Sequence, residues 1–247
     1  LFGVTCHIRK ETPDSKTNIQ FIIDSLSKDS QDSNNNIELQ VQSILIRRSH
    51  LTFDILNKKN TEKQFNPNHI DFNNISGKLS LRHYSQDSLN IQISKLSFDE
   101  ISGLNVDKLS MNVISNRDTA YIENFALRLT YSLVSVPSAG ISLSGVDSLQ
   151  EVTDKLPLHI NLSPSIISPK DLASFLPLLK DFSDVIEISG DISGSANDIS
   201  LNKLTLQYGQ EMTFDGNMKL KGLMSKKNEL YLLGQVKKMN ITTEGLS

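Results

Sequence analysis

The sequence predicts a mainly β protein: an elongated, curled antiparallel sheet, amphipathic and groove-shaped, with two or three short helices. Apolar and polar residues alternate with a period of two along most of the chain, which is typical of strands with one dry face and one wet face. Aromatic residues make up only 6% of the sequence and tryptophan is absent, so Ile, Leu and Val carry most of the apolar mass. Branched aliphatic side chains suit pleated, half-buried strands.

A more specific spacing recurs along the chain. Two apolar residues lie two apart, a step of three follows, and two more apolar residues again lie two apart. In a plain strand the step of three would send the second pair to the opposite face, whereas a β-bulge keeps all four side chains on one face. Coincidence in an aliphatic-rich β protein is the alternative explanation. The sets are Leu39, Val41, Ile44, Ile46; Ile91, Ile93, Leu96, Phe98; Leu104, Val106, Leu109, Met111; Ala120, Ile122, Phe125, Leu127; and Ile199, Leu201, Leu204, Leu206.

Turn signals fall between these sets and favour an antiparallel meander. Ser-Gly pairs recur, and glycine tolerates the positive φ that hairpin turns need. We therefore expect turns at Ser76-Gly77, Ser102-Gly103, Ser144-Gly145 and Ser189-Gly190. The polar stretch 57–69 is expected to be a long hairpin loop.

Three short stretches depart from the two-residue period and predict helices. The first covers 18–26 and the second covers 149–156. The third has the strongest start signal, with Ser168 as N-cap and Pro169 at the first helical position. Pro177 is expected to kink or split this helix, because its ring blocks a backbone hydrogen bond.

The chain is expected to be a single fragment, residues 1–247, of a larger repetitive β-groove protein. Its pattern loosens near 134–157, which is a candidate subdomain break. The net charge of −3 and the pI near 6.0 give no electrostatic reason to expect a nucleic acid as partner.

Residues that carry chemistry are scattered. The five histidines lie far apart in the sequence, and the one cysteine, Cys6, excludes an internal disulfide. His69 beside Asp71 is the nearest approach to a ligand pair, and a solvated loop is the simpler interpretation. The pair Asp99-Glu100 follows a predicted strand and is interpreted as a turn. No nucleotide-binding, hydrolase or metalloprotease motif is present. The sequence therefore predicts a non-enzymatic protein with no catalytic residues, no cofactor and no metal site.

Several stretches resemble the AsmA-like superfamily, in particular the TamB-type translocation and assembly modules of Bacteroidetes. They are FNPNHIDFNNISGKLSL from Phe65, ISKLSFDEISGLNVDKLSMNV from Ile93, PSIISPKDLASFLPLL from Pro164 and EISGDISGSANDISLNKLTLQYG from Glu187. The opening VTCHIRKETPDSKTNIQFIIDSL is similar to the strand, loop and short helix of that superfamily.

This resemblance implies a periplasmic protein of a Gram-negative bacterium, anchored in the inner membrane. Its rolled sheet would form a hydrophobic groove for phospholipid transport between the inner and outer membranes, for outer-membrane protein assembly, or for both. An Omp85-type outer-membrane protein is the implied partner, bound through regions outside this sequence. The chain lacks the family's N-terminal anchor helix and C-terminal partner-docking domain, so neither activity is expected of it alone.

The apolar face itself leaves two interpretations open. If the sheet closes on itself or is capped, the face is only core; if it curls into an open trough, phospholipid acyl chains are the expected ligand. The candidate groove-lining residues are Ile91, Ile93, Leu96, Phe98, Leu104, Val106, Leu109 and Met111.

Two other classes of function compete with a lipid groove. One is a structural or interaction β module that pairs its sheet edges with a client or partner protein through backbone hydrogen bonds. The other is a glycan-binding or glycan-active domain, against which the absence of tryptophan argues.

Overall fold

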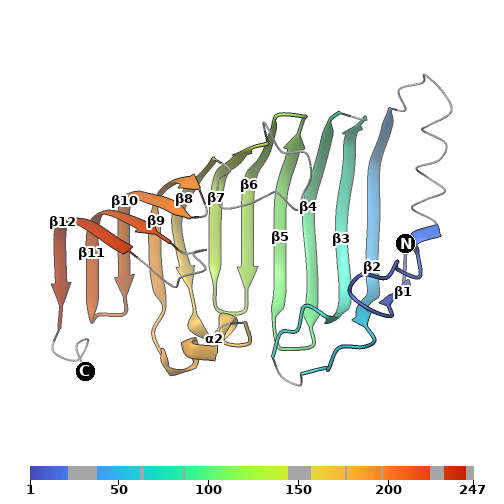
Figure 1. Cartoon of the computed structure of the whole chain (residues 1–247), viewed down its shortest axis with the longest axis horizontal. Helices are drawn as coiled ribbons and strands as arrows, with labels where there is room; N and C mark the ends of the chain where they lie inside the picture. Colours follow the sequence, from blue (N-terminus) through green and yellow to red (C-terminus); the bar gives the residue numbers. More distant parts are fainter. Residues whose placement is uncertain are drawn as a thin grey trace.

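One curled sheet contains the strands of the protein, which follow one another across it in chain order (Figure 1). The computed structural model describes residues 1–21, 38–61, 64–85, 87–143, 157–175, 177–195, 197–222 and 231–242. The strands are β1 (Thr5–Lys10), β2 (Leu39–Ile55), β3 (His69–Tyr84), β4 (Leu89–Glu100), β5 (Asn105–Ser115), β6 (Thr119–Leu129), β7 (Leu133–Ser142), β8 (Leu158–Ile167), β9 (Ile186–Ser195), β10 (Asp198–Tyr208), β11 (Met212–Lys221) and β12 (Tyr231–Ile241).

The pairing is antiparallel from β2 to β12 and parallel only between β1 and β2. The predicted curled, mainly β fold is therefore confirmed. The predicted hairpin loop is also present, since β2 ends at Ile55 and β3 begins at His69. The stretch 134–157 falls partly on β7 and partly outside the described residues, so a subdomain break there stays a prediction.

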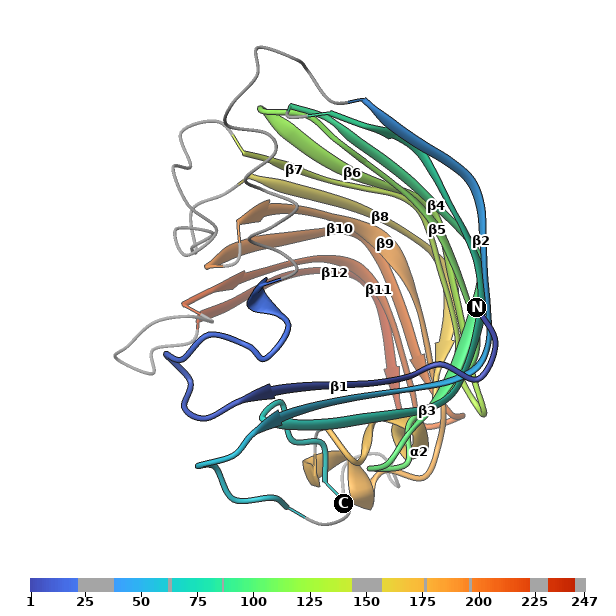
Figure 2. The same ribbon diagram turned by 90° about the vertical axis from the view of Figure 1, so that its right-hand side faces the viewer.

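The sheet is bent across its strands as well as twisted along its length. Figure 2 shows a C-shaped wall, in which β1 and the lower halves of β2 and β3 turn inwards as one arm. Arg48 (φ 49°) and Asn74 (φ 54°) lie where the register between β2 and β3 or between β3 and β4 shifts. A bulge bends its strand, so these two bulges account for the inward turn of the arm.

The predicted step of three is a β-bulge in all five sets. In β10, Leu201 lies opposite Met218 and Leu204 lies opposite Gly216, so three residues of β10 face two of β11. Met218 and Gly216 are two apart and share a face, which places both leucines on that face. The register also shifts at the corresponding step in β2, β4, β5 and β6. Of the five sets, only Leu104 lies outside its strand, in the turn before β5.

The bulge of β6 gives a stability prediction. Asn124 has φ 53°, a left-handed conformation that costs an ordinary residue about 1–2 kcal/mol and a β-branched residue more. We expect Asn124→Val to lower the free energy of unfolding by about 1–2 kcal/mol in urea titrations, and Asn124→Gly to be nearly neutral. Glu123→Val, at the neighbouring exposed position, is the control and should cost little. Equal losses for Val and Gly at position 124 would contradict this account of the bulge.

Two of the predicted Ser-Gly turns are wrong. Ser76-Gly77 lies within β3 and Ser189-Gly190 within β9, while Ser102-Gly103 does form a turn, with φ 108° at Gly103. A Cβ on Gly77 would lie 2.9 Å from the carbonyl oxygen of Lys95 in the adjacent strand. This glycine therefore serves close approach of two strands and not a chain reversal. Ser144-Gly145 lies outside the described residues.

The third predicted helix is present and split. Helix α2 covers Pro169–Leu172 with Ser168 at the N-cap position, and a 3-10 helix covers Pro177–Asp181. The N-cap side chain makes no capping hydrogen bond. The first predicted helix begins at Gln20, and the rest of it lies outside the described residues, as does the whole of 149–156.

Buried side chains gather at the lower end of the sheet, where α2 meets the turn between β6 and β7. One carboxylate oxygen of Asp171 accepts hydrogen bonds from the backbone N–H of Tyr131 (3.0 Å) and from Oγ of Ser132 (2.6 Å). The Ser132 hydroxyl in turn accepts a hydrogen bond from the N–H of Ser168 (2.9 Å). This network fastens α2 to the sheet.

Candidate functional site

Apolar residues are paired with one another on adjacent strands from β2 to β12. Directly paired residues point to the same face, so each row of partners marks one face of the sheet. The central row is Val41, Leu81, Ile91, Val113, Ile122, Ala139, Ile160, Ile192, Leu201, Met218 and Gly234. Every member of this row is apolar.

A second row lies nearer the upper ends of the strands and is also mainly apolar. It consists of Leu39, Tyr84, Leu89, Ser115, Ala120, Ile141, Leu158, Gly194, Ile199, Leu220 and Leu232. Below the bulges the same face continues through Ile46, Gly77, Leu96, Leu109, Leu127 and Val134.

The opposite face is polar at the matching positions. Its row is Ser80, Gln92, Asn112, Glu123, Ser138, Asn161, Asp191 and Asn202. The sheet is therefore amphipathic from β3 to β10, as the period of two predicts.

The apolar face is the inside of the curl. The loop between β2 and β3 lies beneath the arm, on its outer side (Figure 2), and lines a cavity with Thr52 and Asp71. The alternate residues Leu51 and Phe72 must then point inwards. Phe72 is paired with Glu100, which shares a face with Leu96, so the inside of the arm and the apolar rows form one surface.

No second layer packs on this inner face in the described part of the chain. The described strands make extensive contacts only with their neighbours in the sheet, and α2 does so only with the 3-10 helix. Few apolar side chains of the described residues are buried. In the strands they are Ile55, Val106, Leu129, Leu204 and Phe214, and outside the strands Pro169 of α2 is fully buried. The inner-face residues Val41 and Val236 are 37% and 56% exposed. The described residues therefore do not by themselves make this face a closed core.

The structure brings seven of the eight candidate groove-lining residues together on that face. Ile93 is paired with Met111, Leu96 with Leu109, and Phe98 with Val106. Ile91 belongs to the central row, and Leu104 precedes β5. Whether these side chains contact lipid stays a prediction.

Glu100 is a residue of the inner face that the sequence reasoning missed. It is 3% exposed and is paired with Phe72. Its Oε2 accepts hydrogen bonds from the backbone N–H and the hydroxyl of Ser102, while Oε1 has no partner among the described residues. The prediction that Asp99-Glu100 follows the strand as a turn is wrong, because both residues lie within β4, which ends at Glu100. Period two predicts its face, but nothing in the sequence signals its burial.

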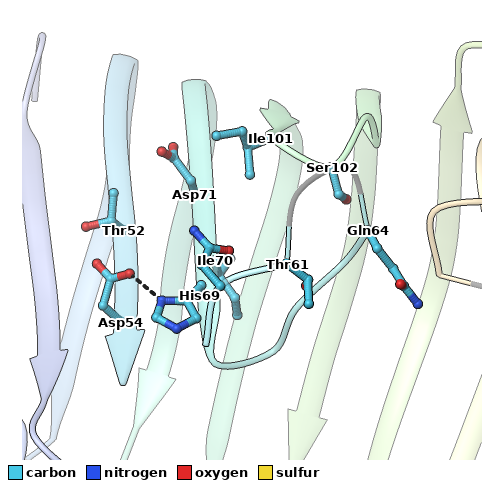
Figure 3. Close-up of a pocket in the computed structure, with 10 residues that line it drawn as sticks. Thr52, Asp54, Thr61, Gln64, His69, Ile70, Asp71, Ile101 and Ser102 are labelled. Atoms are coloured by element: carbon cyan, nitrogen blue, oxygen red, sulfur yellow. Dashed lines mark hydrogen bonds and ion pairs between the residues drawn. The ribbon is translucent and has the colours of Figure 1, made fainter. Parts of the chain in front are cut away.

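The outer side of the arm carries a cavity of about 310 Å³ (Figure 3). His69 lies there within β3 and its side chain is only 12% exposed, so its interpretation as part of a solvated loop is wrong. Its partner is Asp54 of β2 at 2.9 Å, whereas Asp71 bonds to His50 at 2.8 Å. The cavity is lined by Thr52, Asp54, Asn60, Thr61, Gln64, His69, Ile70, Asp71, Ile101 and Ser102.

A hydrogen bond raises the pKa of one residue in this cavity. The hydrogen bond to the Asp54 carboxylate raises the pKa of His69 above 6.5, outweighing the opposite effect of burial, and the carbonyl of Lys58 adds to the rise. No group of three or more metal-ligating side chains occurs among the described residues.

Fold and inner face together define a class of protein: a curled amphipathic β-sheet that is not closed into a barrel and whose apolar interior no described element covers. No protein-family model, curated protein or solved structure matches the chain. Among the helices that the structure describes, none has the length and apolar character needed to cross a membrane.

Proposed function

We propose that this chain is a segment of a periplasmic AsmA- or TamB-like envelope protein whose inner face holds phospholipid acyl chains. The observation that carries the proposal is the set of apolar rows on the inside of the curl, uncovered by any described element. The proposed role is non-enzymatic: the sheet solvates acyl chains during transport between the inner and outer membranes, or supports outer-membrane protein assembly.

The size of the apolar face supports a lipid ligand. Ten strand-to-strand steps separate β2 from β12. At about 4.8 Å a step, the central row is roughly 48 Å long. The hydrocarbon core of a bilayer is about 30 Å thick, so the acyl chains of one leaflet span about 15 Å. The row can therefore hold several acyl chains end to end. Monomeric proteins rarely expose contiguous apolar patches beyond a few hundred Å² without a binding role.

The free energy of covering apolar surface and the family resemblance both support this role. Covering apolar surface contributes about 25 cal/mol per Å², which favours acyl chains inside the trough while headgroups stay in water at its mouth. The family resemblance supports a periplasmic location in a Gram-negative bacterium. An inner-membrane anchor and an Omp85-type partner would involve regions outside this sequence.

The test is lipid content. We expect phospholipid to copurify with the chain after mild extraction from a Gram-negative host, visible as discrete mass increments in native mass spectrometry and identified by solvent extraction. Delipidated protein should also take up a fluorescent phospholipid from vesicles. A protein that is lipid-free after mild extraction and takes up no probe would contradict the proposal.

A second candidate function rests on β12. This terminal strand is exposed along its whole length, and Tyr231, Leu232 and Leu233 are 58–61% exposed. An uncovered edge strand is a template for pairing with another strand. Crosslinks between β12 and a client protein, formed by lipid-free chain, would favour an interaction module over the lipid groove.

A further inference from the structure

Exposed cationic side chains gather on the outer face of the sheet, between β2 and β6. Each of them is next to a residue of the inner face along its own strand, so it points outwards, because side chains alternate between the two faces. We call this set the outer cationic row. Its members, one on each of five adjacent strands, are Arg47, Lys78, Lys95, Lys108 and Arg128.

The register places like charges directly opposite one another in this row. Lys78 is paired with Lys95, and Lys108 is paired with Arg128. Like charges at directly paired positions destabilise a sheet. Lysines also protect exposed sheet edges, but β3 to β6 are interior strands, so edge protection does not account for this arrangement.

Carboxylates offset little of this charge. Arg128 lies 3.8 Å from Asp107, and both side chains are more than half exposed. Lys203 and Lys237, towards the other end of the sheet, lie 3.4 Å and 3.3 Å from carboxylates. The members of the row that form no ion pair among the described residues are Arg47, Lys78, Lys95 and Lys108. Unpaired positive charge is therefore concentrated in one part of a chain whose net charge is −3.

The row lies where the strands bend. Arg47 precedes the bulge residue Arg48, and Lys95 and Lys108 lie at register shifts of β4 and β5. Since a bulge bends its strand, the row lies along the crest of the convex outer side (Figure 2). At about 4.8 Å per strand-to-strand step, it is roughly 19 Å long. A flat surface that touches this crest meets the whole row.

Exposed aliphatic side chains flank the cations. Leu45 is paired with Lys78 and is 49% exposed, and Leu133 is paired with Arg128 and is 50% exposed. Cations beside aliphatic side chains suit an anionic bilayer surface, where the cations meet phosphates and the aliphatic groups enter the headgroup region. Single-stranded nucleic acids stack their bases on aromatic side chains, and the row contains none. The arrangement therefore favours a lipid surface over a nucleic acid.

We propose that the outer cationic row docks the convex face of the sheet on an anionic lipid bilayer. The row lies against the lipid phosphates, and Leu45 and Leu133 enter the headgroup region at its two ends. This docking uses the outer face and does not depend on acyl chains held by the inner face.

Vesicle flotation of the wild-type chain tests the docking. We expect binding to vesicles of phosphatidylcholine that contain phosphatidylglycerol, and at least about tenfold weaker binding to phosphatidylcholine alone. Binding should be lost in about 1 M salt, where charges are screened beyond about 3 Å. Equal binding to the two kinds of vesicle, binding that is insensitive to salt, or equal affinity for a short DNA duplex would overturn the proposal.

A double variant locates the docking surface. A basic residue near an anionic surface contributes about fivefold in affinity, so Lys95→Gln with Lys108→Gln should weaken binding about 25-fold. Its thermal midpoint should not fall, because the change removes like-charge pairs. Lys203→Gln with Lys237→Gln makes the same change of charge elsewhere and is the control, with an expected loss below about threefold. Equal losses in the two double variants would overturn the proposal.

Lipid copurification is read separately from flotation. Chain that is lipid-free after mild extraction but floats with anionic vesicles would contradict the lipid groove and support this docking. Chain that carries lipid but does not float with anionic vesicles would overturn this docking and leave the groove intact.

Discussion

Ile93→Asp is expected to lower the affinity for phospholipid about 100-fold without unfolding the sheet. Ile93 lies on the inner face between Leu79 and Met111, next to the central row. A carboxylate among acyl chains costs about 2.5–3.5 kcal/mol, and each 1.4 kcal/mol is a factor of ten in affinity. Leu109→Asp, paired with Leu96 below the bulge, should act in the same way.

The matched controls carry the same charge on the other face. Gln92→Asp lies next to Ile93 on β4, and Asn112→Asp lies next to Met111 on β5; both belong to the polar outer row. The controls should retain copurifying lipid in native mass spectrometry and uptake from vesicles. Thermal unfolding of all four variants separates lost lipid from lost structure. Full lipid content in a folded Ile93→Asp protein would contradict lipid binding on this face.

The sequence predicts those features of the fold that depend on residues close together along one strand. Which face a side chain takes depends on its neighbours two residues away, so period two assigns the faces. The bulged step is equally local: Leu201 and Leu204 share a face because one extra residue, Lys203 at φ 50°, lies between them. The five sets were therefore predictable from spacing alone.

What the sequence does not predict depends on pairing between distant residues. The parallel addition of β1 to β2 joins Thr5 to His50, which no local pattern signals. The cross-strand pair His50–Asp71 and the burial of Glu100 likewise exist only once the register is set. Ser76-Gly77 shows the same limit, because its composition is typical of a turn while the approach of the adjacent strand keeps it in β3.

Whether the trough is open is the feature that the sequence predicts least. Period two requires only that one face be apolar; whether that face is covered depends on what else packs against it. Here no described element forms a second layer on that face, and buried polar side chains gather only at the lower end of the sheet, in the network around α2. The stability of that end is therefore expected to depend on a few polar contacts more than on apolar packing.

Asp171→Ala is expected to lower the free energy of unfolding by about 2–3 kcal/mol. Asp171 is 9% exposed, and its loss leaves the Tyr131 N–H and the Ser132 hydroxyl without their acceptor. Hydrogen bonds to a charged group contribute about 1.5–3 kcal/mol, and each buried donor left unpaired costs about 1–3 kcal/mol. Urea unfolding measures the total change.

Two variants show whether this loss comes from the hydrogen bonds. Asp171→Asn keeps an acceptor oxygen and should recover part of the stability, whereas Asp181→Ala, at an exposed position of the 3-10 helix, should change it by less than about 0.5 kcal/mol. Hydrogen exchange should locate the Asp171→Ala effect at the turn between β6 and β7, because the Tyr131 amide loses its acceptor there. If Asp171→Ala and Asp181→Ala were equally mild, the network would not be what holds α2 to the sheet. The lower end would then depend on the packing of Pro169, the most fully buried side chain described, and Pro169→Ala would become the more damaging change.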